Sequence, residues 1–349
     1  MAKLFYKDKP IIGLDISQTG MKLMAVDTRK WLVTGYGSID LEPNKVQASL
    51  DGTDDYLLTN LQLLKTKHLV GEIASEHVAI SVPTSRTYTR SFSLPLDAAK
   101  NLQEAIDLEV DQYIPLPSDT LYVDSEIISK DTNGITVSVC AVPRTIVDRC
   151  IEIAENAQFR PCLVEPGINS IARLLEMTER GHLPTVIIDI GPAATDVAIL
   201  DGSIRVTSSL TVGSNTFTLD IAKRLKVPLE SAHQLKVISG LNAGPRQQKI
   251  KSALTPSLER ILSEIRKVVK YYTERIESSA KLEQVLVVGA GSNVPGIGEY
   301  FTNELVMPAR VASPWQQLNF GKLASPAKQF RSRYITVAGL ASINPQEIL

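Results

Sequence analysis

The stretch that decides the fold is Ile11-Ile-Gly-Leu-Asp15-Ile-Ser-Gln-Thr-Gly-Met-Lys22-Leu-Met-Ala-Val-Asp27. It contains an apolar run, an aspartate, a turn of small and polar residues, a second apolar run and a closing aspartate. The stretch Val186-Ile-Ile-Asp189-Ile-Gly191-Pro-Ala-Ala-Thr195-Asp-Val-Ala-Ile-Leu-Asp201 repeats this order, with both aspartates 174 residues further on. Apolar runs joined by such a turn predict β-hairpins. Their recurrence at half the chain length predicts two related lobes.

The composition is that of an ordinary globular protein. The chain has 349 residues, 44% hydrophobic and 21% charged, so we expect two to three domains. A net charge of −1 excludes a global attraction to nucleic acid or anionic lipid. Cys140, Cys150 and Cys162 lack metal-site spacing and are expected to be free thiols. No apolar run is long enough for a membrane span, and the one after residues 1–10 is too short for a signal peptide, so we expect a cytoplasmic protein.

A different kind of sequence separates the two hairpins. Apolar spacing predicts strands over 76–83 and 135–142 and helices over 98–112 and 145–157. We interpret this block as an insertion in the first lobe. The expected units are a first-lobe core at 1–75, the inserted subdomain at 76–150, a return to the first lobe at 151–184 and the second lobe at 185–349.

The second half of the chain ends its regular pattern with a glycine loop. Helices are expected over 215–225 and 231–238, and Thr255-Pro256 is expected to start a long amphipathic helix that reaches Ile276. The strand 284–288 then runs into Gly289-Ala-Gly291, where missing side chains allow a base or sugar to approach. The alternative is an ordinary glycine turn that links a strand to a helix. No G-x-G-x-x-G follows the first strand and no G-x-x-x-x-G-K-[ST] occurs, so the Rossmann and P-loop motifs are excluded.

The aspartates of the two hairpins indicate a site for phosphate and a metal ion. A carboxylate at the end of a buried strand reaches Mg²⁺, usually through water, while the amides of the following turn point at phosphate oxygens. A single copy is more simply explained as hairpin capping. Because the device occurs twice, we expect Asp15 and Asp189 to hold Mg²⁺ on a phosphate chain gripped from both sides.

Two hairpins followed by a late Gly-x-Gly loop resemble the actin-like ATPase superfamily. Within it the chain resembles the PilM family of type IV pilus assembly proteins, relatives of the division protein FtsA. The segments that carry this resemblance cover most of the chain: 12–22, 104–117 with its Tyr113-Ile-Pro115-Leu-Pro117, 186–196, 286–300 and 334–341. The resemblance implies an α/β, actin-like (ribonuclease H-like) two-lobed ATPase fold with an inserted FtsA-type small α/β subdomain.

The resemblance also implies an ATP site with named residues. The first phosphate loop would contain Asp15, Ser17, Gln18 and Thr19, with Lys22 facing the phosphate; the alternative for Lys22 is a solvent-facing strand position. The second loop would contain Asp189, Gly191 and Thr195. The helix of Ala232-His-Gln-Leu-Lys236 would cover the adenosine with Lys236 on the nucleotide side, and Gly289, Gly291 and Asn293 would close over it.

Catalysis is less well supported by the sequence. Hydrolysis needs a group that orients the attacking water. Glu165, before the helix expected at 167–177, resembles the position where bacterial actins carry a catalytic acid, although it equally well caps that helix. The second loop reads Gly191-Pro192-Ala193, where actin has a further acidic residue. We therefore expect ATP binding with slow or no hydrolysis.

The family resemblance implies a partner at the membrane. Tyr113, Pro115 and Pro117 are either a plain helix stop or part of the region where the short N-terminal cytoplasmic peptide of a PilN-like inner-membrane protein binds. Contacts with other pilus proteins and with a second copy stay open, as does a related type II secretion system. The C-terminal residues 342–349 lack a basic amphipathic helix, so we expect recruitment through the partner and no direct membrane insertion. The alternatives are an FtsA-like polymerising division protein and a sugar or small-molecule kinase.

Overall fold

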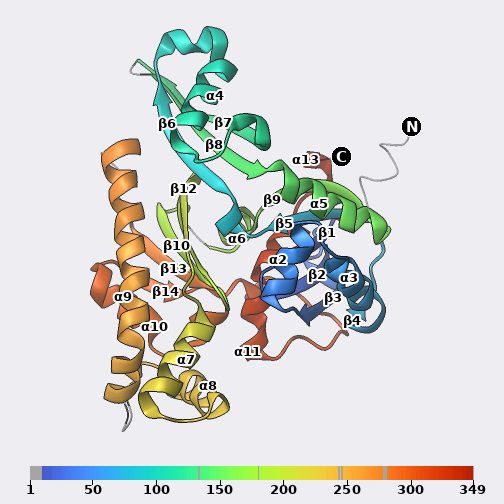
Figure 1. Cartoon of the computed structure of the whole chain (residues 1–349), viewed down its shortest axis with the longest axis vertical. Helices are drawn as coiled ribbons and strands as arrows, with labels where there is room; N and C mark the ends of the chain where they lie inside the picture. The colour runs from blue at the N-terminus through green and yellow to red at the C-terminus, as the bar shows by residue number, and fades with distance from the viewer. Residues whose placement is uncertain are drawn as a thin grey trace.

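Two β-sheets form the frame of the protein. In the computed structural model, which describes residues 10–132, 134–179, 181–242, 244, 247–277 and 281–348, one sheet has six strands and the other eight (Figure 1). The expectation about a leader rests partly on residues 1–9, which lie outside the described residues. Within the described ranges, no helix has both the length and the apolar character that crossing a membrane requires.

The first sheet has the strand order β4-β3-β2-β1-β5-β9. Its strands are β1 (Ile12–Ser17), β2 (Gly20–Asp27), β3 (Leu32–Asp40), β4 (Leu69–Gly71), β5 (His77–Val82) and β9 (Arg160–Pro166). Alternate residues of β1 point to one face, where they pack on the helices α2 (Pro43–Leu50), α3 (Tyr56–Lys67) and α5 (Arg144–Asn156).

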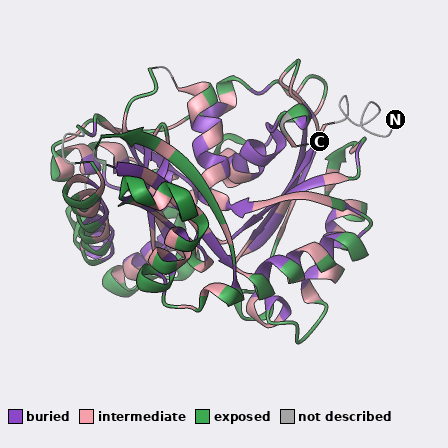
Figure 2. Cartoon of the chain, turned by 90° about the horizontal axis from the view of Figure 1, so that it is seen from above, coloured by how far each residue is buried: buried purple, intermediate pink, exposed green. Residues whose placement is uncertain are grey.

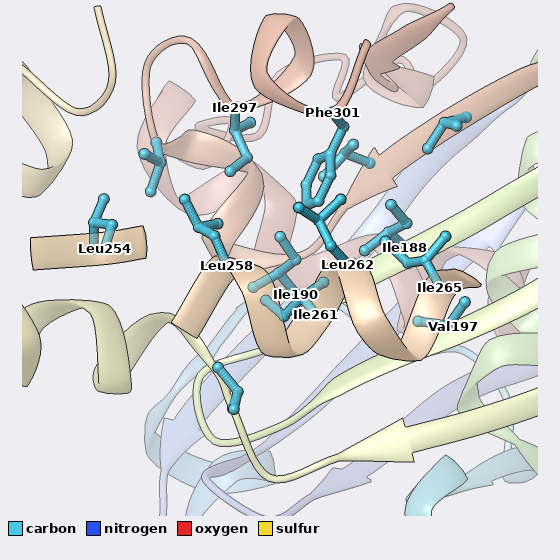
Figure 3. Close-up of a cluster of buried hydrophobic side chains, with 14 of the residues drawn as sticks. Ile188, Ile190, Val197, Leu254, Leu258, Ile261, Leu262, Ile265, Ile297 and Phe301 are labelled. Carbon is cyan, nitrogen blue, oxygen red and sulfur yellow. The ribbon is translucent and has the colours of Figure 1, made fainter. Parts of the chain in front are cut away.

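The second sheet has the strand order β14-β13-β10-β11-β12-β6-β8-β7. Its strands are β6 (Tyr88–Leu94), β7 (Leu121–Asp131), β8 (Gly134–Pro143), β10 (Thr185–Ile190), β11 (Thr195–Asp201), β12 (Ser203–Leu210), β13 (Gln284–Val288) and β14 (Ala309–Val311). One buried cluster joins β10–β13 to the helices α7 (Ser214–Leu225), α8 (Leu229–Ile238), α9 (Gln247–Tyr271) and α10 (Ile297–Leu305). Figure 3 shows α9 side chains such as Leu262 and Ile265 against Ile188 and Val197 of the strands.

The helices α6 (Gly167–Thr178) and α12 (Ile335–Ala341) lie between the two sheets. One buried cluster joins them to Met24 of the first sheet and Ile187 of the second. Gly339 allows this close packing, because a Cβ there would lie only 1.9 Å from the carbonyl oxygen of Ser170 in α6. Figure 2 shows buried residues along the strands of both sheets. The two sheets therefore share a core, which determines how their hairpins face each other.

The inserted segment differs from its expected boundaries. Strand β5, which falls in the insertion expected at 76–150, pairs with β1 in the first sheet, and α5 packs on that sheet as well. Strands β6, β8 and β7 instead extend the second sheet beyond β12, and the helix α4 (Leu102–Tyr113) packs on them. Sequence spacing shows that strands exist, but it carries no information about which distant strand they pair with.

The helix expected to start at Pro256 starts earlier. Helix α9 begins at Gln247 and contains Pro256 in its interior, and a π-helical turn (Tyr272–Ile276) follows it. A proline inside a helix costs about 3 kcal/mol. Ile250 and Leu254 before the proline are fully buried in the same cluster as Leu258 after it, and their burial offsets that cost. Short helices α11 (Lys328–Arg331) and α13 (Pro345–Ile348) complete the C-terminal part.

Candidate functional site

The two hairpins are equivalent in their pairing. In the first, Asp15 lies opposite Lys22, and β1 runs parallel to β5. In the second, Asp189 lies opposite Asp196, and β10 runs parallel to β13. Each aspartate therefore stands near the carboxyl end of a strand that lies between one antiparallel and one parallel neighbour. The repeat seen in the sequence is also a repeat of structure.

Both hairpin turns line one cavity of about 400 Å³. This volume falls in the range of about 300–1,000 Å³ typical of small-molecule sites. The first hairpin contributes Asp15, Ser17, Gln18, Thr19 and Lys22, and the second contributes Asp189, Gly191, Pro192, Ala193 and Asp196. Gly289 and Ala290 of the late loop, Thr84 and Arg333 also line it. Residues from both sheets thus surround the same space.

Asp15 is held by two donors on the first sheet. Its carboxylate accepts hydrogen bonds from Lys22 Nζ at 2.6 Å and from Ser81 Oγ at 2.7 Å. The same ammonium lies 3.1 Å from Ser17 Oγ. Asp15 is buried, whereas Lys22 is partly exposed to the cavity. Lys22 thus neutralises Asp15 and keeps its ammonium at the cavity wall.

In the second hairpin, the described structure gives the carboxylates of Asp189 and Asp196 no ammonium partner comparable to Lys22. Burial, reinforced by repulsion from Asp196 and Asp15, raises the pKa of Asp189 to about 7, and Lys22 opposes this only in part. Burial also raises the pKa of Asp196 to about 6, although hydrogen bonds from Ser209 and Thr84 oppose the shift. Three carboxylates therefore face a space that Lys22 cannot neutralise alone, an arrangement that favours a bound cation.

The residues present fit a magnesium ion held through water. Over the described part of the chain, no group of three or more His, Cys, Asp or Glu side chains is arranged to ligate a metal directly. Mg²⁺ commonly keeps several waters and binds through one or two carboxylates plus substrate phosphates. Asp15 and Asp189 would hold it in that way, and the ion would supply positive charge to a phosphate chain.

Gly289 brings the late loop against the second hairpin. It has φ +80°, and a Cβ there would lie 2.1 Å from Asp189 Oδ1. Gly291 packs in the same way on Ile190, since its Cβ would lie 2.2 Å from that side chain. Glycine at both positions therefore lets the late loop reach the carboxyl end of β10.

Several expected site residues lie behind the cavity and do not line it. Thr195 Oγ1 donates to Val212 O at 2.6 Å, and Asn293 Nδ2 donates to Gln329 O at 3.0 Å. Lys236 is buried, and its Nζ donates to Ser214 O at 2.9 Å at the start of α7. Burial lowers the pKa of Lys236 to about 8. These side chains hydrogen-bond to backbone carbonyls of neighbouring segments. Their contact with nucleotide stays a prediction.

Glu165 forms an ion pair with another side chain. Both oxygens of its carboxylate accept hydrogen bonds from the guanidinium of Arg173, at 2.7 and 2.6 Å. Glu165 is buried and does not line the cavity. Its catalytic role stays a prediction, and these contacts argue against it.

Other cavity residues were absent from the sequence prediction. Thr84, from the turn after β5, and Arg333, from the segment before α12, line the cavity. Ser81 of β5 lies outside the lining and donates to Asp15. Asp196 directly follows Thr195, which was predicted. Asp196 could have been predicted as well, because the hairpin pattern in the sequence places it opposite Asp189. The others depend on tertiary packing.

The predicted partner region lies on the inserted subdomain. Tyr113 is 50% exposed at the end of α4, and its ring stacks on Phe92 with centroids 6.4 Å apart. Pro115 and Pro117 are exposed, and Ile114 beside them is buried. The turn is thus anchored by Ile114 and by the partly buried Leu116, and it presents Tyr113, Pro115 and Pro117 to solvent.

Comparison with known proteins identifies the family. A family model described as "Type IV pilus assembly protein PilM" matches residues 13–343. The chain belongs to the PilM family. Its sequence is 22% identical over 304 residues to the cell division protein FtsA of Neisseria meningitidis, covering 79% of this chain and 68% of that protein.

Solved structures confirm the actin-like fold of this PilM-family chain. A structure described as a PilM-PilN type IV pilus biogenesis complex matches with a TM-score of 0.75 and 19% identity, covering 96% of this chain and 98% of that one. The ethanolamine utilization protein EutJ of Carboxydothermus hydrogenoformans matches with a TM-score of 0.56, 16% identity and coverage of 95% and 88%. MreB 5 of Spiroplasma citri bound to AMPPNP matches with a TM-score of 0.54, 14% identity and coverage of 95% and 94%.

The raised pKa of Asp189 predicts a stability effect of pH. Because the folded-state value of about 7 lies above the ordinary 3.8, the folded protein takes up a proton, and this site loses stability as pH rises from about 4 through 7. Asp189→Asn should therefore raise the melting temperature of the ligand-free protein at pH 8 by about 2 °C or more, and by less at pH 5. Thermal melts at both pH values measure this, with the exposed Asp97→Asn as control. A destabilised Asp189→Asn at pH 8 would contradict the charge imbalance.

Proposed function

We propose that this PilM-family protein binds MgATP between its two sheets and acts as a cytoplasmic scaffold of the type IV pilus machinery. A PilN-like inner-membrane protein would recruit it through a short cytoplasmic N-terminal peptide. The observation that carries the proposal is the pair of equivalent hairpin turns that face one cavity. Membership of the PilM family supports the pilus role.

The cavity suits a phosphate chain gripped from both sides. The turns at 17–20 and 191–194 line the cavity, so their N–H groups other than at Pro192 would donate to phosphate oxygens there, and Lys22 adds a positive charge. Asp15 and Asp189 would bind waters of the magnesium ion. Gly289 and Ala290 line the cavity on the side of the second sheet, where the ribose and base would lie. The AMPPNP bound to the matching MreB 5 supports a nucleotide as ligand.

Removing either strand-end carboxylate should weaken MgATP binding. Calorimetry with the wild-type protein should show one MgATP per chain. Asp15→Asn and Asp189→Asn should each raise the Kd about tenfold or more in Mg²⁺, as expected when groups that orient a metal are lost. Asp27→Asn changes the far end of the same first hairpin and should leave the Kd unchanged. Equal MgATP affinity in all three variants would refute the site.

The arrangement supports slow hydrolysis. Pro192 and Ala193 line the cavity, and neither side chain can orient a water molecule. Glu165 is bound by Arg173, as described above. Among the cavity carboxylates we assign the orientation of water to Asp196, which lies opposite the proposed metal-binding Asp189.

Turnover should be at least about a hundredfold below the ~10 s⁻¹ typical of enzymes. Phosphate release measured with excess MgATP tests this. Asp196→Asn should abolish any residual rate, whereas Glu165→Gln should leave it unchanged provided that its melting curve shows an intact fold. Fast release that collapses in Glu165→Gln would make Glu165 the catalytic residue and reverse the proposal.

The partner proposal rests on the inserted subdomain. The presence of PilN in the matching PilM-PilN complex supports a PilN-like partner. The turn after α4 offers the exposed Tyr113, Pro115 and Pro117, and α4 itself exposes Leu108. An extended peptide with apolar side chains would find contacts there without unfolding any element. Self-association and contacts with other pilus proteins remain open proposals.

A fluorescent peptide of the N-terminal tail of the cognate PilN-like protein should bind with an affinity measurable by anisotropy. Tyr113→Ser should weaken it about tenfold or more, as loss of a central aromatic contact does. Tyr122→Ser, on strand β7 of the same subdomain and also exposed, is the matched control and should bind as wild type does. Absence of binding in the wild type would remove the scaffold proposal but not the MgATP site.

A further inference from the structure

The inserted subdomain, residues 88–143, is attached to both halves of the molecule. The chain enters it from β5 through the turn Thr84–Arg86 and leaves it from β8 directly into α5, so its covalent connections lead to the first sheet. Its strand β6 pairs with β12 of the second sheet (Figure 1). A rotation of the two sheets about the cavity therefore has to be absorbed at these connections or at the contact between β6 and β12.

This contact, the β6–β12 seam, is held by few bonds. Its ladder contains the single pair of Arg90 and Val206. Three side chains of the inserted subdomain donate to backbone carbonyls of β12: Arg90 Nη1 to Thr207 at 2.6 Å, Ser91 Oγ to Arg205 at 2.9 Å and Ser138 Oγ to Ile204 at 3.0 Å. By contrast, β11 and β12 pair along seven residues. Side chains replace the backbone ladder here, so the seam is the weak point of the second sheet.

Arg90 is the charged group of the seam. Its guanidinium lies 5.8 Å from the centre of the Tyr271 ring and also donates to Thr89 O at 2.8 Å. Burial lowers its pKa, and Tyr271 and Glu264 oppose this shift. Within the described ranges, no carboxylate forms a salt bridge with it. Because carbonyls and a ring hold this cation, the seam can shift without separating an ion pair.

The seam is connected to the cavity through Asp196. Ser209 of β12 donates to the Asp196 carboxylate, and Thr84, which begins the turn into β6, hydrogen-bonds to the same carboxylate. Thr84 and Asp196 both line the cavity. A ligand that repositions Asp196 therefore acts on β12 and on the entrance to β6 at the same time.

We propose that the β6–β12 seam transmits nucleotide occupancy to the inserted subdomain, with Arg90 as the positioning residue that holds the subdomain to the second sheet. The inference rests on the proposed nucleotide binding and adds that the nucleotide regulates the inserted subdomain. MgATP draws the two hairpins together, and the seam carries that movement to the surface where a partner docks. The nucleotide shifts the subdomain only by its different affinity for the two arrangements.

Hydrogen exchange with and without saturating Mg-AMPPNP tests this route. In the wild type, amides of 203–210, 88–94 and 121–143 should change their exchange rates by about fivefold or more, the lower end of typical coupling between sites. Arg90→Met keeps the apolar stem on Tyr271 but removes the bond to Thr207. The response of 121–143 should be lost in this variant, while calorimetry still shows one Mg-AMPPNP bound per chain. Arg90→Lys, which retains one donor, should restore part of the response.

Arg144→Met is the matched control. Arg144 donates to Asp119 O at 3.1 Å and lies 4.4 Å from the Tyr122 ring, so it makes the same kinds of contact where the subdomain joins the first sheet. In Arg144→Met, the change in hydrogen exchange of 121–143 on adding Mg-AMPPNP should equal that of the wild type. Absence of Mg-AMPPNP binding would overturn the nucleotide proposal and this inference with it. Binding without any response of 121–143, or with an equal response in Arg90→Met, would overturn this inference alone.

Discussion

The repulsion between carboxylates at one cavity is the constraint on which the rest of the structure depends. Asp15 and Asp189 stand at the ends of strands in different sheets, with Asp196 beside them. Lys22 and Ser81 satisfy Asp15, whereas Asp189 keeps a pKa of about 7. Bringing such groups together costs folding free energy unless a cation or a proton joins them. The protein bears this cost at the position where the proposed magnesium ion would offset it.

The packing of the fold holds these carboxylates in place against their repulsion. The helices α6 and α12 are packed between the sheets, and Gly339 lets them approach so closely that the two halves share one core. Gly289 presses the late loop against Asp189 in the same manner. The opening of the cavity is thus set by the packing of the helices and the loop that border it. Movement between the halves has to occur at the weaker contacts, of which the β6–β12 seam is one.

Local patterns predicted what depends on local structure. The two hairpins, their aspartates and the glycine loop follow from apolar runs and turn residues, and the structure places them around one cavity. Ser81 and Thr84 were missed because only the parallel pairing of β1 with β5 brings them beside Asp15 and Asp196. The pairing of β6 with β12 is likewise a contact between distant segments. The predicted helix start at Pro256 was wrong. Helix α9 begins two turns earlier, because burial of Ile250 and Leu254 outweighs the cost of a proline in the helix interior.

The most direct test is a crystal structure with Mn²⁺ and AMPPNP, in which anomalous scattering locates the metal. The account predicts one ion between Asp15 and Asp189, joined to them through water, and phosphates against the turns at 17–20 and 191–194. A nucleotide bound to one sheet only, or a metal remote from both aspartates, would contradict it.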